Sequence, residues 1–184
     1  QGFSEKQMMP LKSSRACDIA VGDLNGDKHN ELIICQSQTK YAFTTESLIF
    51  KGKKNGIATE PIRLVTHDAR RVFIPKSFTE TPAQIVFVNH FSGGKTGRLD
   101  VAVFMGDSDG YLPERCQKVS GESTTESLIC DVTDDGWPDL ILVNNAEMIK
   151  DEDPGSFVFK NGPQGRPHDP TWKVPSKNAM GGCC

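Results

Sequence analysis

Asp23-Leu24-Asn25-Gly26-Asp27-Lys28-His29-Asn30-Glu31 runs directly into the apolar segment Leu32-Ile33-Ile34-Cys35. A second stretch, Asp131-Val132-Thr133-Asp134-Asp135-Gly136-Trp137-Pro138-Asp139, runs in the same way into Leu140-Ile141-Leu142-Val143. Asp23 and Asp131 are 108 residues apart, which is twice a period of 54 residues. An acidic turn with a glycine that recurs in register before an apolar segment indicates an internal repeat.

The same period appears in four glycine turns. The glycines lie 54, 54 and 55 residues apart and are Gly2, Gly56, Gly110 and Gly165. The aromatic residues that end three apolar segments repeat with spacings of 54 and 55 and are Phe50, Phe104 and Phe159. Another strand-like patch follows each glycine, as expected for β-hairpins in which glycine supplies a positive φ. These patches are Met8–Leu11, Ile62–Val65, Cys116–Val119 and Thr171–Val174.

Each period contains four short strand-like segments and no convincing amphipathic helix. Four strands in a repeat of this size are typical of a propeller blade. We therefore expect an all-β fold, a partial β-propeller with about three blades of four antiparallel strands. The expected boundaries are the end of a preceding blade at 1–11, blades at 12–66, 67–120 and 121–175, and the start of a next blade at 176–184. Because a ring takes ~4–8 blades, we expect the native protein to continue on the C-terminal side.

The composition argues against several classes of protein. The chain has 184 residues, a formal net charge of -3 and scattered lysines and arginines, which argues against a nucleic-acid-binding protein. No apolar run approaches the ~20 residues of a membrane-spanning helix. The six cysteines form no C-x-x-C pair, so they are either disulfide partners in an oxidising compartment or small buried side chains.

The acidic stretches place oxygen donors at loop positions 1, 3, 5 and 9, and position 7 offers a main-chain carbonyl. Calcium takes six to eight hard oxygen ligands, which alternate residues of a tight loop can supply. The predicted ligands of the first loop are Asp23, Asn25, Asp27, the carbonyl of His29, and Glu31. Those of the last loop are Asp131, Thr133, Asp135, the carbonyl of Trp137, and Asp139. The alternative is an ordinary turn whose carboxylates cap backbone groups.

The loops differ in how well they match this pattern. The middle repeat reads Ser77-Phe78-Thr79-Glu80-Thr81-Pro82-Ala83-Gln84, where hydroxyls replace carboxylates, so we expect it to have lost the site. Thr133 holds position 3 of the last loop, with Asp134 as a substitute donor. We therefore expect calcium to bind the first loop more tightly than the last.

These loops resemble those of FG-GAP repeats, also called VCBS-type repeats, of integrin-α-like proteins. The resemblance covers the chain as repeat units, although only two loops carry the motif, and Glu31 and Thr133 depart from it. It implies a β-propeller, often of seven blades, with calcium on the loop between the first two strands of a blade. It also implies a secreted or cell-surface protein that acts in adhesion, matrix contact or carbohydrate binding.

The leading functional hypothesis is a non-catalytic, calcium-binding adhesion scaffold outside the cytoplasm, which binds an extracellular protein or carbohydrate and packs against further blades of the same longer chain. No H-E-x-x-H or G-x-S-x-G motif occurs, so we expect no enzyme activity. The alternatives are a lectin-like propeller and a non-catalytic part of a secreted hydrolase or lyase. Trp137 and Trp172 could stack on a sugar ring, although packing between blades is the commoner role.

Overall fold

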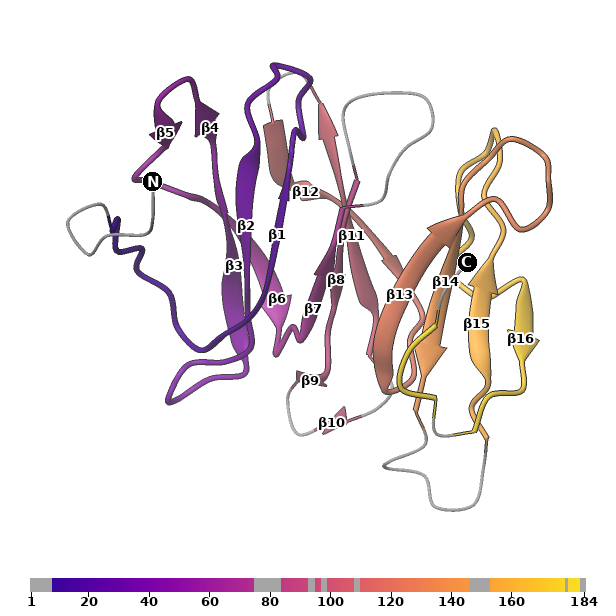
Figure 1. Cartoon of the computed structure of the whole chain (residues 1–184). Helices are drawn as coiled ribbons and strands as arrows, with labels where there is room; N and C mark the ends of the chain where they lie inside the picture. Colours follow the sequence, from indigo (N-terminus) through magenta and orange to yellow (C-terminus); the bar gives the residue numbers. More distant parts are fainter. Residues whose placement is uncertain are drawn as a thin grey trace.

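The computed structural model of the chain describes residues 8–74, 84–92, 95–96, 99–107, 110–145, 153–177 and 179–182. Within these ranges the fold is all-β and contains no helix. Three four-stranded antiparallel sheets follow one another along the chain and lie side by side (Figure 1). The described residues also contain no helix long and apolar enough to cross a membrane.

Sheet 1 has the order β1-β2-β3-β6, so each strand pairs with the next one along the chain apart from a short inserted hairpin. Its strands are β1 (Ala16–Gly22), β2 (Glu31–Gln36), β3 (Thr44–Phe50) and β6 (Ile62–His67). The inserted hairpin consists of β4 (Gly52–Lys53) and β5 (Gly56–Ile57).

Sheets 2 and 3 repeat this meander. Sheet 2 pairs β7 (Arg71–Phe73), β8 (Gln84–Val88), β11 (Val101–Asp107) and β12 (Gly110–Val119) in that order. A separate small ladder joins β9 (Phe91–Ser92) to β10 (Lys95–Thr96). Sheet 3 pairs β13 (Thr124–Cys130), β14 (Asp139–Asn144), β15 (Ser156–Phe159) and β16 (Trp172–Val174).

The prediction of an all-β fold with four-stranded antiparallel sheets is confirmed. One predicted strand differs: Met8–Leu11 lies outside the strands, since residues 8–13 form no ladder. Pro10 lacks the N–H that a ladder requires, which is the local reason for this difference. The three sheets of the described residues form no closed ring, so the propeller itself stays a prediction.

The sheets pack face to face through apolar side chains. The cluster between sheets 1 and 2 includes Ile33, Ile49 and Phe87, and Phe87 meets Phe104 edge to face with ring centroids 5.9 Å apart. A second cluster between sheets 2 and 3 includes Val86 and Leu140. Because both faces of sheet 2 are covered, its strand β8 is apolar on both sides rather than alternating.

Two local features recur in all three sheets, one in the backbone and one in side-chain hydrogen bonds. A residue that precedes the first strand of each sheet adopts φ near +46°, and these residues are Arg15, Asp68 and Ser123, with φ of 46°, 47° and 45°. The buried side-chain amide of a residue at or just after the end of each second strand donates to a backbone carbonyl near the start of the third strand. These bonds run from Gln36 to Glu46, from Asn89 to Asp100 and from Asn144 to Gly155. The three sheets are therefore equivalent units in detail as well as in outline.

Candidate calcium-binding loops

The two acidic stretches occupy the same joint in two sheets. The first connects β1 to β2, the other connects β13 to β14, and both lie at the upper end of the sheets in Figure 1. The middle loop, predicted to have lost its site, lies largely outside the described residues, which exclude 75–83.

The carboxylate at position 9 closes the first loop. Glu31 is only 3% exposed. Its Oε2 accepts a hydrogen bond from the N–H of Leu24 at 2.8 Å, and its Oε1 accepts one from the N–H of Gly52 at 3.1 Å. Gly52 lies so close to the loop that a Cβ atom there would stand 2.5 Å from the carbonyl oxygen of Asn30. Glu31 therefore joins the start of its loop to the chain that leaves β3.

Asp139 repeats this arrangement in sheet 3. It is fully buried, its Oδ2 accepts from the N–H of Val132 at 3.1 Å, and its Oδ1 accepts from the N–H of Asn161 at 2.8 Å. The hydroxyl of Thr133 also points to Oδ2, at 3.5 Å. The sequence pattern predicted both carboxylates as ligands but missed Gly52 and Asn161, because their N–H groups act through the backbone and leave no mark on residue type.

The aspartate at position 1 gathers backbone N–H groups. Asp23 Oδ1 accepts from Gly26 at 2.7 Å and from Asn25 at 3.3 Å, and Oδ2 accepts from Lys28 at 2.9 Å. Desolvation raises the pKa of Asp23, but the backbone N–H groups of Lys28, Gly26, Asn25 and Asp27 outweigh it and hold that pKa below its ordinary value. These N–H groups therefore favour the charged form of the carboxylate.

Asp131 plays the same part in the last loop, where Oδ1 accepts from Asp135 at 3.2 Å and Oδ2 from Gly136 at 2.7 Å. Positions 4 and 6 are left-handed in both loops. They are Gly26 and Lys28, with φ of 82° and 68°, and Asp134 and Gly136, with φ of 56° and 85°. The two loops therefore share one backbone path although their glycines occupy different positions.

Positions 3, 5 and 7 form the rim of each loop, where all side chains are exposed except the half-buried His29 and Thr133. In the first loop, Asn25 Oδ1 accepts from the N–H of Asp27 at 2.9 Å, and Asp27 Oδ1 accepts from the N–H of His29 at 2.7 Å. In the last loop, Asp135 Oδ1 accepts from the N–H of Trp137 at 3.0 Å. An oxygen that accepts one N–H keeps a second lone pair, so these bonds leave room for a cation.

A lysine distinguishes the last loop. Lys160 Nζ lies 3.0 Å from Asp135 Oδ2. Its hydrogen bond is the main cause of a lowered pKa at Asp135, with a smaller contribution from the N–H of Trp137. In the described part of the chain, no basic side chain forms an ion pair with Asp27 of the first loop.

The donor chemistry suits calcium, since Asp23, Asn25 and Asp27 supply hard oxygens from alternate positions. Yet no three His, Cys, Asp or Glu side chains of the described residues form a group that could hold a metal ion by themselves. The amide of Asn25 and a main-chain carbonyl would have to complete the set, which accords with the predicted role of His29. Whether calcium binds stays a prediction for both loops.

Comparison with known proteins adds no identity: no protein-family model matches the chain, and no curated protein matches it.

Proposed function

We propose that this chain is a calcium-binding β-propeller repeat region that serves as a non-catalytic adhesion or binding scaffold outside the cytoplasm. The observation that carries the proposal is the shared plan of the two acidic loops. They join equivalent strands, position 9 accepts equivalent N–H groups, and positions 4 and 6 are left-handed in both. A plan that recurs in register is better explained by a common ligand than by two independent turns.

Calcium would neutralise the clustered carboxylates and hold the first strand of a sheet to the second. In the first loop, the proposed ligands are Asp23, Asn25, Asp27, the carbonyl of His29, and Glu31, which also closes the loop through its hydrogen bonds. In the last loop, the proposed ligands are Asp131, Thr133, Asp135, the carbonyl of Trp137, and Asp139, which also closes the loop through its hydrogen bonds. The neutral hydroxyl of Thr133 and the ammonium of Lys160 favour the first loop as the tighter site.

The propeller arrangement is supported by how the sheets meet. The first strands β1, β7 and β13 are neighbours from one sheet to the next, as expected where the innermost strands surround a common axis. Further blades of the same longer chain would complete such a ring. The described cysteines favour neither compartment: Cys35 is a buried free thiol, and Cys17 is an exposed one.

The decisive experiment is thermal unfolding with calcium and with EGTA. Calcium is expected to raise the melting temperature of the wild-type chain, because it binds the folded state alone. Asp23→Asn with Asp27→Asn should remove most of this increase. A melting temperature that is the same with calcium and with EGTA would refute the proposal.

A lanthanide can separate the two loops. Trp137 holds position 7 of the last loop, so excitation of its indole should sensitise terbium bound there, and much less terbium bound at the Asp23 loop. Terbium emission that appears only at higher metal concentration than the thermal shift would place the tighter site in the first loop. Terbium emission that appears at a lower metal concentration than the thermal shift would show that the last loop is the tighter site.

A lectin-like role is the second candidate, because the indole of Trp137 is exposed beside the last loop. A glycan array with the wild-type chain and Trp137→Ala tests it. Specific glycan binding that the substitution removes would favour a carbohydrate ligand over a protein ligand.

A further inference from the structure

One side chain of the first acidic loop lies inside the apolar cluster between sheets 1 and 2. Leu24 at loop position 2 is 1% exposed and belongs to that cluster, although its neighbours Asp23 and Asn25 belong to the proposed calcium ligands. The cluster joins side chains of both sheets, among them Ile49 of sheet 1 and Phe104 of sheet 2. The loop that connects β1 to β2 is therefore also part of the contact between two sheets.

Hydrogen bonds tie Leu24 to both ends of its loop. The N–H of Leu24 donates to Oε2 of the buried Glu31 at 2.8 Å. Asp23, directly before Leu24, accepts from three N–H groups of the turn that follows. A movement that withdraws the Leu24 side chain from the cluster therefore displaces the carboxylates at positions 1 and 9 or breaks their hydrogen bonds.

Sheet 2 also lies close to the far end of the loop. Tyr111 of β12 is 4% exposed and belongs to the same cluster. Burial is the main cause that raises the pKa of its phenol, and the charge of Glu31 raises that pKa further. Glu31 is therefore within electrostatic reach of sheet 2, so positions 2 and 9 of the loop both lie beside the neighbouring sheet.

We infer that calcium binding at the first loop controls the contact between sheets 1 and 2, and that Leu24 transmits the effect to the apolar cluster. The inference rests on the proposed calcium site and goes beyond it, because the ion would hold two sheets together and not only two strands of one sheet. Asp23 and Asn25 flank Leu24 and would both hold the ion, so the interface cannot open at Leu24 without disturbing them. Ion binding and interface opening are thereby linked.

Cys35 supplies a reporter for the opening of this interface. It is a free thiol, is 0% exposed and lies in the same cluster as Leu24. Burial raises the pKa of the Cys35 thiol, and the thiolate is the form that reacts, so a maleimide modifies it when the chain opens around it. Cys17 is an exposed free thiol and measures the intrinsic rate of the reagent.

The test is pulsed labelling with N-ethylmaleimide, followed by peptide mass spectrometry that reads Cys35 and Cys17 separately. The chain carries Asp131→Asn and Asp135→Asn, so the first loop is its one remaining proposed site, and isothermal titration calorimetry measures calcium binding to it. Free calcium at about 100 times its Kd should slow the labelling of Cys35 by up to about 100-fold relative to EGTA, while Cys17 keeps its rate.

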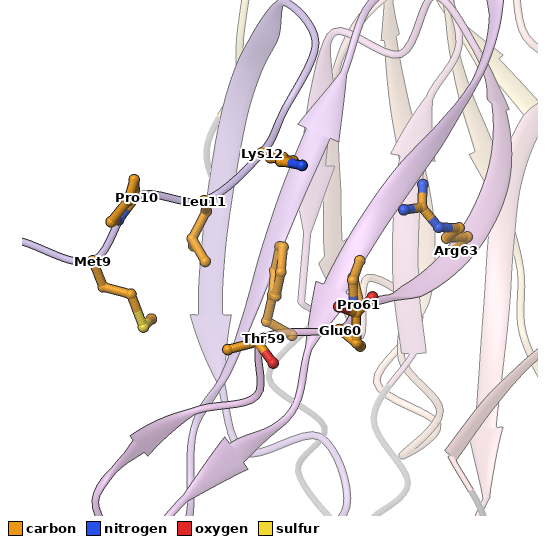
Figure 2. A pocket seen from close by; sticks show the side chains of 9 residues that line it. Met9, Pro10, Leu11, Lys12, Thr59, Glu60, Pro61 and Arg63 are labelled. Atoms are coloured by element: carbon orange, nitrogen blue, oxygen red, sulfur yellow. The ribbon is translucent and has the colours of Figure 1, made fainter.

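Leu24→Ala removes the proposed link, and Leu48→Ala is its matched control. Leu48 is 2% exposed but lies on the opposite face of sheet 1, in a separate cluster with Phe50. Phe50 and Leu11 also line a cleft of about 350 Å³ on that face (Figure 2). Both variants should speed labelling in EGTA, since each leaves a cavity. Calcium should slow labelling by the wild-type factor in Leu48→Ala and by about tenfold less in Leu24→Ala, a loss within the range of coupling between linked sites.

The outcomes separate this inference from the calcium proposal. Calcium binding without slower labelling of Cys35 would overturn the inference and leave the calcium proposal standing. Equal calcium factors in Leu24→Ala and Leu48→Ala would also overturn it, because the link would then not pass through Leu24. The absence of calcium binding would refute the calcium site of the first loop and this inference with it. If circular dichroism shows that Leu24→Ala loses its β structure, Leu24→Val with Leu48→Val as control should give the same order.

Discussion

The Asp23 loop and the Asp131 loop follow the same backbone path with different side chains. Both close on a buried carboxylate, but Glu31 accepts two N–H groups, whereas Asp139 accepts two N–H groups and the hydroxyl of Thr133. A lysine approaches the rim of the last loop alone among the described contacts. The hydrogen bonds within each loop hold the same backbone path, and the two loops differ in the charge at the rim, where a cation would bind.

The largest expected effect comes from the buried carboxylates. Asp139→Ala leaves the N–H groups of Val132 and Asn161 without their acceptor and should lower the free energy of unfolding by about 2–4 kcal/mol. Glu31→Ala should cost a similar amount, slightly less because no hydroxyl is lost. Urea denaturation measures both, with the exposed Asp134→Asn as control. If either loss stayed below the control, the carboxylate would not be what closes the loop.

The lysine tests the difference between the rims. Lys160→Met should raise the calcium affinity of the last loop by about two- to fivefold, as expected for the loss of an exposed ion pair of ~0.5–1 kcal/mol. Lys51→Met is the matched control, because Lys51 holds the equivalent place after β3 and should change nothing. Terbium emission sensitised by Trp137 reports the affinity. Equal effects of the two substitutions would show that calcium affinity depends on the net charge of the chain and not on the contact between Lys160 and Asp135.

The left-handed positions test the shared backbone. Gly136→Ala should destabilise the chain by about 1 kcal/mol, because a side chain is strained at φ of 85°. Lys28→Gly at the equivalent position 6 should stabilise it by up to about 1 kcal/mol, for the same reason in reverse. Thermal melts in EGTA compare the two. A stabilising Gly136→Ala would mean that the loops do not share this conformation.

The smallest expected effect is on the pH dependence of the chain's stability. The pKa of Asp23 is lower in the folded chain than its ordinary value, so the unfolded chain binds more protons in that window. This carboxylate therefore contributes stability above about pH 4, and the contribution is lost as the pH falls through the folded pKa. Asp23→Asn should therefore reduce the change in the free energy of unfolding with pH in this range.

The effect of salt on the pH dependence of stability distinguishes the two loops. Asp135 owes its lowered pKa chiefly to Lys160, an exposed pair, so its contribution should fade in 1 M salt. Asp23 owes its lowered pKa to backbone N–H groups and should be much less affected. If the contribution of Asp23 to the pH dependence of stability also disappeared in salt, the assignment to backbone N–H groups would be contradicted.

Much of the architecture could be predicted from residue order. Apolar segments such as Leu32–Cys35 and Leu140–Val143 lie in the second strands, and Leu48–Phe50 and Phe157–Phe159 lie in the third. The prediction of a strand at Met8–Leu11 was wrong. Its apolar pattern imitates one, but packing against sheet 1 does not require a ladder, and Pro10 cannot complete it.

The sequence by itself determined the period, the four strands per repeat and the place of the acidic loops, because strand alternation and turn residues act over a few neighbouring positions. Only the tertiary structure decided that Gly52 and Asn161 bind the buried carboxylates and that Lys160 meets Asp135. It also decided which apolar faces are covered and which stay open. These contacts join residues brought together by the stacking of strands and sheets, and stacking depends on shape and register that no local pattern encodes.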